Sequence, residues 1–157
     1  MKRTFGAILV AAVLMLGVVA TANARAQKTE GTFAPVPGHG DFGISGTASL
    51  IRTGGKTIAK VNLEGLEPGE TYGVHVHNAP CSVGGGGHYQ NQIGGPAAPP
   101  NELWPSSGGK GTGITATPSG NGSGYAKAPW IARPEAQSVV VHHYADSSIR
   151  VACAQLS

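Results

Sequence analysis

Two of the six histidines of the chain stand at alternate positions, His75 and His77, in the stretch GVHVHNAPC. Residues two apart on a β-strand point to the same side, so the two imidazoles should project side by side, about 7 Å apart along the backbone. Imidazoles in this arrangement can bind one metal ion, but an H-x-H pair also occurs by chance on exposed strands. The pair alone is therefore a weak indication of a metal site.

Other histidines could complete such a site. His88 follows four consecutive glycines, which would let the backbone fold back towards the strand of the first pair. His142 and His143 end a VVV run, and because adjacent residues on a strand face opposite sides, only one of them can join the same site. Four imidazoles suit a tetragonal Cu(II) site, which permits redox chemistry, whereas zinc takes imidazole in tetrahedral form and permits hydrolysis or structure. The ligand type alone leaves both metals open.

The N-terminus is typical of a secretory signal peptide. Lys2 and Arg3 precede an apolar run that ends in the small residues TANARAQ, which predicts a signal peptide over residues 1–24 with cleavage after Ala24 or Ala26. A membrane anchor is the alternative, but a span needs roughly 20 apolar residues and this run has about 16. We therefore expect a secreted or periplasmic protein with no membrane anchor after cleavage.

The remaining chain is long enough for one domain with a hydrophobic core. Residues 25–37 are predicted to be a flexible tail, with an edge strand as the alternative, and residues 38–157 to be the folded domain. Cleavage after Ala24 leaves nine Lys and Arg and eight Asp and Glu, so the formal net charge falls from +3 to +1. Basic residues are scattered singly, so we expect no nucleic-acid partner.

Cys81 and Cys153 are the two cysteines of the chain. In an exported protein they favour a disulfide over two free thiols. Closing a loop of about 70 residues would contribute on the order of 4 kcal/mol of stability in the chain-entropy account. The bridge would tie the loop that follows the HVH stretch to the last predicted strand.

Several segments have β-branched and apolar residues at alternating positions and are separated by turn sequences such as GGK and EPGE. These segments are residues 43–53, 56–66, 71–77, 137–143 and 148–156. Between them, residues 84–124 are rich in Gly, Pro, Ser and Asn and predict a long loop, functional or disordered, with short apolar pieces such as residues 113–117. Short strands with Gly-rich turns and no helical period indicate an all-β antiparallel sandwich or barrel.

The motifs GLEPGETYGVHVH, GGGGHYQ, IGGP, VVVHHYAD and RVACAQL follow one another in an order and approximate spacing that resemble the copper/zinc superoxide dismutases. The match extends from about Gly43 to the C-terminus. Each motif alone is unspecific, but HVH, VVH followed by x-x-A-D, and R-x-A-C together are highly specific. The resemblance implies a Greek-key β-barrel with long Gly/Pro-rich loops.

The resemblance also assigns roles to single residues. It implies a Cys81–Cys153 disulfide, and it makes Arg150 the cation that attracts and orients superoxide. His88 falls at the position of the imidazole that bridges copper to zinc in the family and takes up a proton when copper is reduced. His143 falls at a position where the family has a residue that does not bind the metal, so an exposed or hydrogen-bonded histidine is expected there. The implied copper ligands are His75, His77, His88 and His142.

The chain departs from the family in two places. The loop YQNQIGGPAAPPNELWPSS after His88 contains no histidine, and Ile93 stands where a zinc ligand would be, so we expect no zinc site. Only residues 143–149 separate the last copper ligand from Arg150, where the family has a much longer charged loop. Both departures resemble the copper-only branch, in which a glutamate orients the bridging histidine. Glu102 is the candidate, and a solvated loop carboxylate is the alternative.

The sequence therefore predicts an exported, copper-dependent superoxide dismutase without zinc, which converts superoxide to O2 and hydrogen peroxide. The alternatives are an exported copper-binding or copper-buffering protein with little dismutase activity, and a metal-free β-scaffold. Arg150 and Glu102 favour the enzyme, and the loss of Met1 and Met15 with the signal peptide leaves no Met-rich tract suited to Cu(I) transfer. The oligomeric state is not set by the sequence, and a monomer is the preferred expectation.

Overall fold

The computed structural model describes residues 25–157 of the chain. The predicted signal peptide, residues 1–24, lies outside the described residues. Within residues 25–157 the regular structure is β-strand apart from one turn of 3-10 helix, η1 (Cys81–Val83). No helix in this part of the chain is long and apolar enough to cross a membrane.

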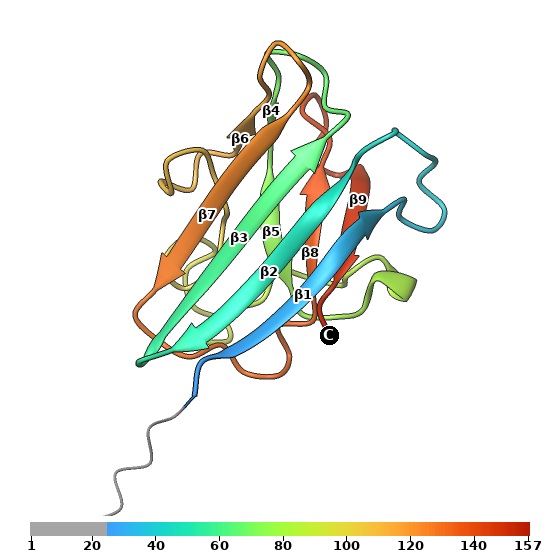
Figure 1. Ribbon diagram of the computed structural model, residues 1–157. Helices are drawn as coiled ribbons and strands as arrows, with labels where there is room; N and C mark the ends of the chain where they lie inside the picture. The colour runs from blue at the N-terminus through green and yellow to red at the C-terminus, as the bar shows by residue number, and fades with distance from the viewer. Residues whose placement is uncertain (1–24) are drawn as a thin grey trace, which may run out of the picture.

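Seven strands form one antiparallel sheet in the order β5-β8-β9-β1-β2-β3-β7 (Figure 1). Their bounds are β1 (Gln27–Ala34), β2 (Ser45–Thr53), β3 (Lys56–Glu64), β5 (Val74–His77), β7 (Gly122–Ala128), β8 (Ser138–His142) and β9 (Arg150–Gln155). Two short strands, β4 (Thr71–Tyr72) and β6 (Ile114–Thr115), pair with each other in a second sheet.

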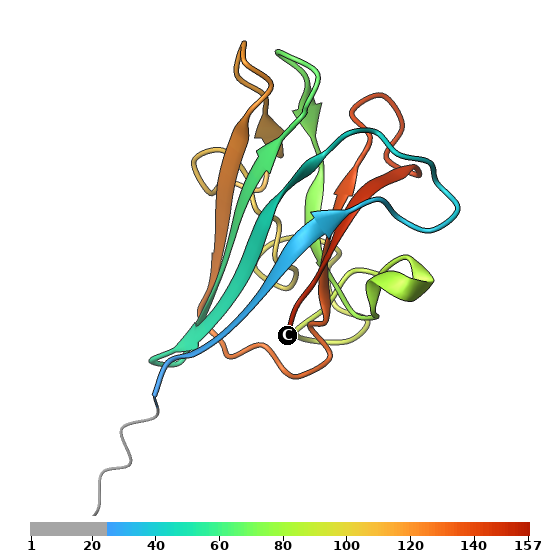
Figure 2. The same cartoon turned by 45° about the vertical axis from the view of Figure 1, so that its right-hand side comes forward.

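Strand β1 joins the two halves of the large sheet. Residues 27–32 pair with β2, and Phe33 and Ala34 pair with β9. The sheet curls at this point, so that β1, β2, β3 and β7 face β5, β8 and β9 (Figures 1 and 2). The chain crosses between the halves from β3 to β5, from β5 to β7 and from β7 to β8, which is a Greek-key arrangement. The predicted all-β antiparallel barrel is thus confirmed.

The hydrophobic core lies between the two halves. Alternate side chains of β2 and β3 are buried, as the period of two predicts; Leu50 is 0% and Val61 1% exposed. Val74 and Val76 of β5 join the same core cluster from the opposite half. Because β5 turns these valines inward, its remaining side chains face away from the core, towards the loop that follows the strand.

The structure corrects the prediction of a flexible tail over residues 25–37, because residues 27–34 form β1. The sequence QKTEGTFA gave little sign of a strand, since Phe33 is its one buried side chain. Hydrogen bonding to β2 on one side and β9 on the other holds this segment in place. The folded domain therefore begins before residue 38.

Strand β7 was missed in the sequence because its inner face carries very small residues. Gly122 and Gly124 occupy the inward positions ahead of Ala126, and a Cβ atom at Gly122 would lie 2.6 Å from Cγ2 of Ile114. At Gly124 a Cβ atom would lie 2.7 Å from the carbonyl carbon of Ser106. The glycines leave the room that these neighbours fill, so the strand lacks the β-branched pattern by which strands are recognised.

Candidate metal centre

Two of the candidate ligands come from β5. His75 and His77 occupy the face of the strand opposite Val74 and Val76, and their ring centroids are 6.4 Å apart. His77 is 1% exposed although it lies outside the core. The loop after β5 therefore covers this face of the sheet.

That loop delivers His88. It runs along the free edge of β5, where Tyr89 N–H donates to Val76 O at 2.8 Å and Val76 N–H donates to Leu103 O at 3.0 Å. Tyr89 and Leu103 are each 1% exposed, so buried side chains anchor this long segment of irregular backbone. As a result the ring of His88 lies 4.1 Å from that of His75, centroid to centroid.

Gly85 allows the loop to lie flat on the sheet. Its φ is +88°, a left-handed conformation that favours glycine, and a Cβ atom there would lie 2.7 Å from Cγ2 of Val140. The next residue, Gly86, accepts a hydrogen bond from Nδ1 of His77 at 3.3 Å. The glycine run thus has a packing role as well as a turning role.

The fourth histidine comes from the end of β8. The register between β8 and β9 shifts between Val141 and His142, and His142 N–H donates to Gly73 O at 2.8 Å. His142 is 6% exposed, and its Nε2 lies 3.3 Å from Nε2 of His77. His143 does not join the cluster, because its ring packs against Phe42 and Tyr144 instead.

The four histidines converge on one point. One ring nitrogen from each lies within 4.8 Å of the others, and the four residues are His75, His77, His88 and His142. In three of them Nδ1 is bonded to an oxygen, which holds the proton there and leaves Nε2 free towards the cluster; the acceptors are Gly86 O at 3.3 Å, Glu102 Oε2 at 2.7 Å and Ser147 O at 2.7 Å. The exception is His75, whose Nδ1 is buried without a hydrogen-bond partner among the described residues.

Burial keeps the imidazoles neutral. It lowers the pKa of His75 to about 2, helped by the charges that His88, His142 and His77 would carry. Burial likewise lowers the pKa of His77 to about 3, with His88, His142 and Arg150 acting in the same direction. The pKa of His142 is also lowered, chiefly by burial. At neutral pH His75, His77 and His142 are therefore neutral.

Such a cluster fits a metal ion. Buried polar atoms are normally paired, yet Nδ1 of His75 has no partner within residues 25–157, and the unprotonated Nε2 atoms of His77 and His142 face each other at 3.3 Å. A cation between them would accept all of these lone pairs. Four imidazoles without a thiolate or carboxylate are a donor set that suits copper or zinc.

Glu102 lies behind His88, on the side away from the cluster. The carboxylate is 2% exposed and accepts three hydrogen bonds, from Nδ1 of His88 at 2.7 Å, Nε2 of Gln90 at 2.9 Å and Nε1 of Trp104 at 2.8 Å. Burial alone would raise the pKa of Glu102, but these hydrogen bonds outweigh burial and lower it. The carboxylate is therefore ionised and fixes the Nδ1–H tautomer of His88. It is not a solvated loop residue.

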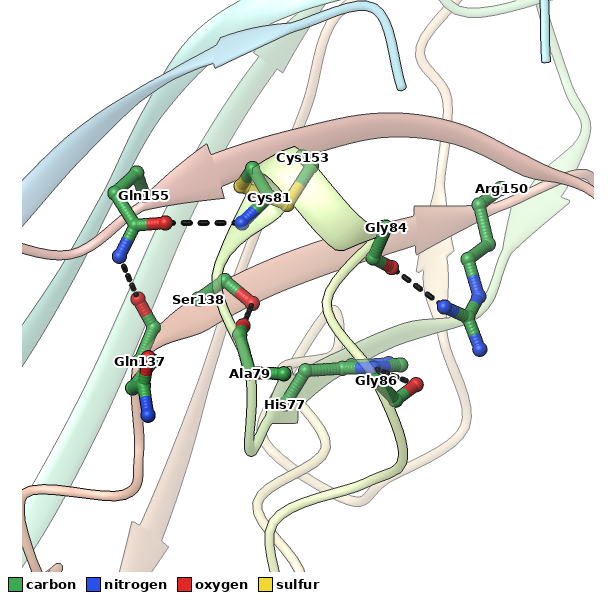
Figure 3. Close-up of a disulfide and its surroundings, with 10 residues drawn as sticks. All are labelled: His77, Ala79, Cys81, Gly84, Gly86, Gln137, Ser138, Arg150, Cys153 and Gln155. Atoms are coloured by element: carbon green, nitrogen blue, oxygen red, sulfur yellow. Dashed lines mark hydrogen bonds between the residues drawn. A yellow bond between two sulfur atoms is a disulfide. The ribbon is translucent and has the colours of Figure 1, made fainter. Parts of the chain in front are cut away.

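Arg150 begins β9 and pairs in register with His142. Its guanidinium donates to Gly84 O in the loop that carries His88 (Figure 3). Burial is the largest cause of the lowered pKa values of His77 and His142. The positive charge of Arg150 lowers both values further, in the same direction as His88. Arg150 thus places a positive charge beside the histidine cluster.

Cys81 and Cys153 form the predicted disulfide, with their Cα atoms 5.7 Å apart (Figure 3). Cys81 N–H also donates to Oε1 of Gln155 at 2.9 Å, so η1 is fastened to β9 at two points. The loop continues directly from η1 to Gly84 and Gly86, whose carbonyl groups bond Arg150 and His77. The disulfide therefore secures the segment that holds both side chains.

The roles of some residues of the site could not be recognised from the sequence alone. Gln90 and Trp104 bond Glu102, but neither belongs to a motif that signals such a role. Gly86 and Ser147 orient His77 and His142 through backbone carbonyl groups, which every residue type has. Only the nearness of Trp104 to Glu102 in the segment NELW offered any hint.

No protein-family model matches the chain, and no curated protein matches it in sequence. Among solved structures the chain is similar to a Cu/Zn superoxide dismutase from Brucella abortus, with 24% sequence identity and a TM-score of 0.52. The similarity covers 83% of this chain and 100% of that one. The likeness shows that the chain has the fold of that protein.

Proposed function

We propose that the protein is an exported, copper-dependent superoxide dismutase of the copper-only type. The observation that carries the proposal is the convergence of four imidazoles on one point, with an ionised, buried carboxylate behind the one that comes from the long loop. The fold shared with a Cu/Zn superoxide dismutase supports it. The substrate would be the superoxide anion, and the products O2 and hydrogen peroxide.

In the proposed site the metal would be held by Nδ1 of His75, which has no partner among residues 25–157, and by the Nε2 atoms of His77, His88 and His142. Copper held there would supply one-electron redox chemistry, by cycling between Cu(II) and Cu(I). Arg150 attracts and orients the anionic substrate at short range. His88 takes up a proton at Nε2 when that atom is free, and ionised Glu102 stabilises the resulting imidazolium through its bond to Nδ1–H.

We further propose that the protein has no zinc site. Ile93, at the position where the resemblance places a zinc histidine, is 86% exposed and offers no ligand. Glu102, at the position nearest the zinc-site aspartate, already has its two oxygens occupied by three donors. Glu102 thus orients His88 in place of a second metal ion.

Export is proposed from residues 1–24, and the structure described for residues 25–157 is compatible with either cleavage site. Cleavage after Ala24 or after Ala26 leaves β1, which begins at Gln27, complete. The intact mass of the protein recovered from the periplasm or medium would identify the new N-terminus. A mature protein that retains residues 1–24 would contradict export by this signal.

The central experiment is metal analysis together with a superoxide-dismutation assay on the exported, copper-loaded protein. We expect one copper ion per chain and dismutase activity, both lost in His142→Gln. His143→Gln is the matched control, because the adjacent ring packs against Phe42 outside the cluster and should leave both unchanged. Copper binding without activity would instead support a copper carrier.

A further inference from the structure

Trp104 lies at the edge of the histidine cluster. It is partly buried, and its ring centroid lies 5.0 Å from that of His75 and 6.2 Å from that of His88. Leu103, the residue before it, is bonded to the backbone of β5 and 1% exposed. Trp104 and Glu102 are therefore held on either side of a fixed backbone anchor.

The indole of Trp104 shares an acceptor with His88. Nε1 donates to Oε2 of Glu102 at 2.8 Å, and Nδ1 of His88 donates to the same oxygen at 2.7 Å. The other oxygen, Oε1, accepts from Gln90 at 2.9 Å. An indole N–H can only donate, so the direction of the Trp104 bond does not depend on any protonation state.

We propose that Trp104 is a positioning residue of the metal centre. Its N–H fixes Oε2 of Glu102 in place, so Oε2 stays aligned with Nδ1–H of His88 and Nε2 of His88 remains directed at the other three histidines. The inference rests on the proposed function only in taking His88 as a ligand. The hydrogen-bond chain from Trp104 through Glu102 to His88 is made by side chains of this protein alone.

Loss of the hydrogen bond from Trp104 to Glu102 should have a measurable effect because the carboxylate is buried. Glu102 is 2% exposed, so water cannot readily replace a missing donor at Oε2. Trp104→Phe removes the N–H but keeps an aromatic ring beside His75. In this variant Oε2 should become more mobile, so its alignment with Nδ1–H of His88 should be lost and the bond to His88 should loosen.

The first test is made on the metal-free exported protein by NMR of the histidine side chains. In the wild type, His88 should show the Nδ1–H tautomer with slow solvent exchange of that proton. Trp104→Phe should speed the exchange roughly tenfold or more, as expected when a hydrogen bond to a charged group is lost. An unchanged tautomer and exchange rate would overturn the inference.

Trp130→Phe is the matched control. Trp130 also donates its indole N–H to this loop, to Pro100 O at 3.0 Å, but it does not bond Glu102. The control should leave the exchange rate of the His88 proton unchanged. An equal effect in both variants would mean that any loosening of the loop disturbs His88, and would also overturn the inference.

A double-mutant cycle tests whether Trp104 acts through Glu102 or through its packing on His75. If it acts through Glu102, then Glu102→Gln and the double variant with Trp104→Phe should show the same His88 exchange and the same Cu(II) EPR spectrum. Additive changes would refute this route. Should Trp104→Phe not fold, Glu102→Gln alone still decides, since it must shift the indole N–H signal of Trp104 and the His88 signal together.

These measurements separate the inference from the proposed function. The exchange rates are read without metal, so an inactive wild-type protein would refute the dismutase but leave the positioning role intact. Conversely, if the wild type is an active dismutase and Trp104→Phe leaves the exchange rate of the His88 Nδ1 proton unchanged, the proposed function would stand and the positioning role of Trp104 would be refuted.

Discussion

The metal-free protein should lose stability as the pH falls from 7 to 5, because His75, His77 and His142 are buried in the neutral form. The pKa of His75 is about 2 and that of His77 about 3 in the folded chain, against about 6.5 in an unfolded one. Between these values the unfolded state binds more protons than the folded state, so the free energy of unfolding decreases with falling pH. The stabilisation is complete above the unfolded pKa and is lost progressively below it.

The magnitude follows from the two pKa values. For each histidine that stays neutral in the folded chain, protonation of the unfolded chain between pH 7 and pH 5 lowers the free energy of unfolding by about 2 kcal/mol. For His75 and His77 together the free energy of unfolding would fall by up to about 4 kcal/mol, a large part of the stability of an ordinary domain. His142 adds to this in the same direction, since burial lowers its pKa as well.

Urea unfolding of the chelator-treated protein, with its disulfide intact, measures this dependence at several pH values. The midpoint should fall steeply between pH 7 and pH 5 in the wild type and less steeply in His77→Gln. His143→Gln, which alters a partly exposed ring outside the cluster, should retain the wild-type slope. A flat wild-type profile, or an equal slope in His77→Gln, would refute the assignment of the pH dependence to the buried cluster.

Three further outcomes are expected. Replacing Cys81 and Cys153 by serine should lower the free energy of unfolding by on the order of 4 kcal/mol, measured by denaturant titration without reductant. A loss below about 1 kcal/mol would contradict a stabilising role of the disulfide. Glu102→Gln should keep copper but lose activity mostly at higher pH, where protonation of His88 most needs the carboxylate; pH-independent rates would sink this role. Gly85→Ala should destabilise the chain by at least about 1 kcal/mol in thermal unfolding, since its φ is +88° and the added Cβ would meet Val140; an unchanged midpoint would show that the loop can move.

The strands with regular alternation could be predicted from the sequence, because their inward side chains are β-branched or apolar. Val74 and Val76 mark the inner face of β5, which in turn places His75 and His77 on the outer face. Strand β1 escaped prediction because backbone pairing on both sides holds it, and β7 because glycine and alanine fill its inner face. In both cases the strand is formed through contacts with neighbouring segments of the fold, which its own sequence does not show.

The candidate site divides in the same way. The side chains that meet in the cluster have distinctive types and spacings, and the resemblance supplied His142 rather than His143. The groups that orient them, such as Gly86 O and Ser147 O, are backbone atoms and leave no trace in composition. Gln90 and Trp104 are ordinary loop residues until Glu102 is seen to be buried between them.

The carboxylate behind His88 has a consequence for proton transfer in the proposed enzyme. A metal ion on Nδ1 of His88 would take the place of the proton there, whereas Glu102 requires that proton in order to accept a hydrogen bond. Nδ1 therefore stays protonated throughout, and any further proton can be received only at Nε2. Because Nε2 faces the cluster beside which Arg150 lies, the protein's own proton should become available on the side where superoxide is attracted.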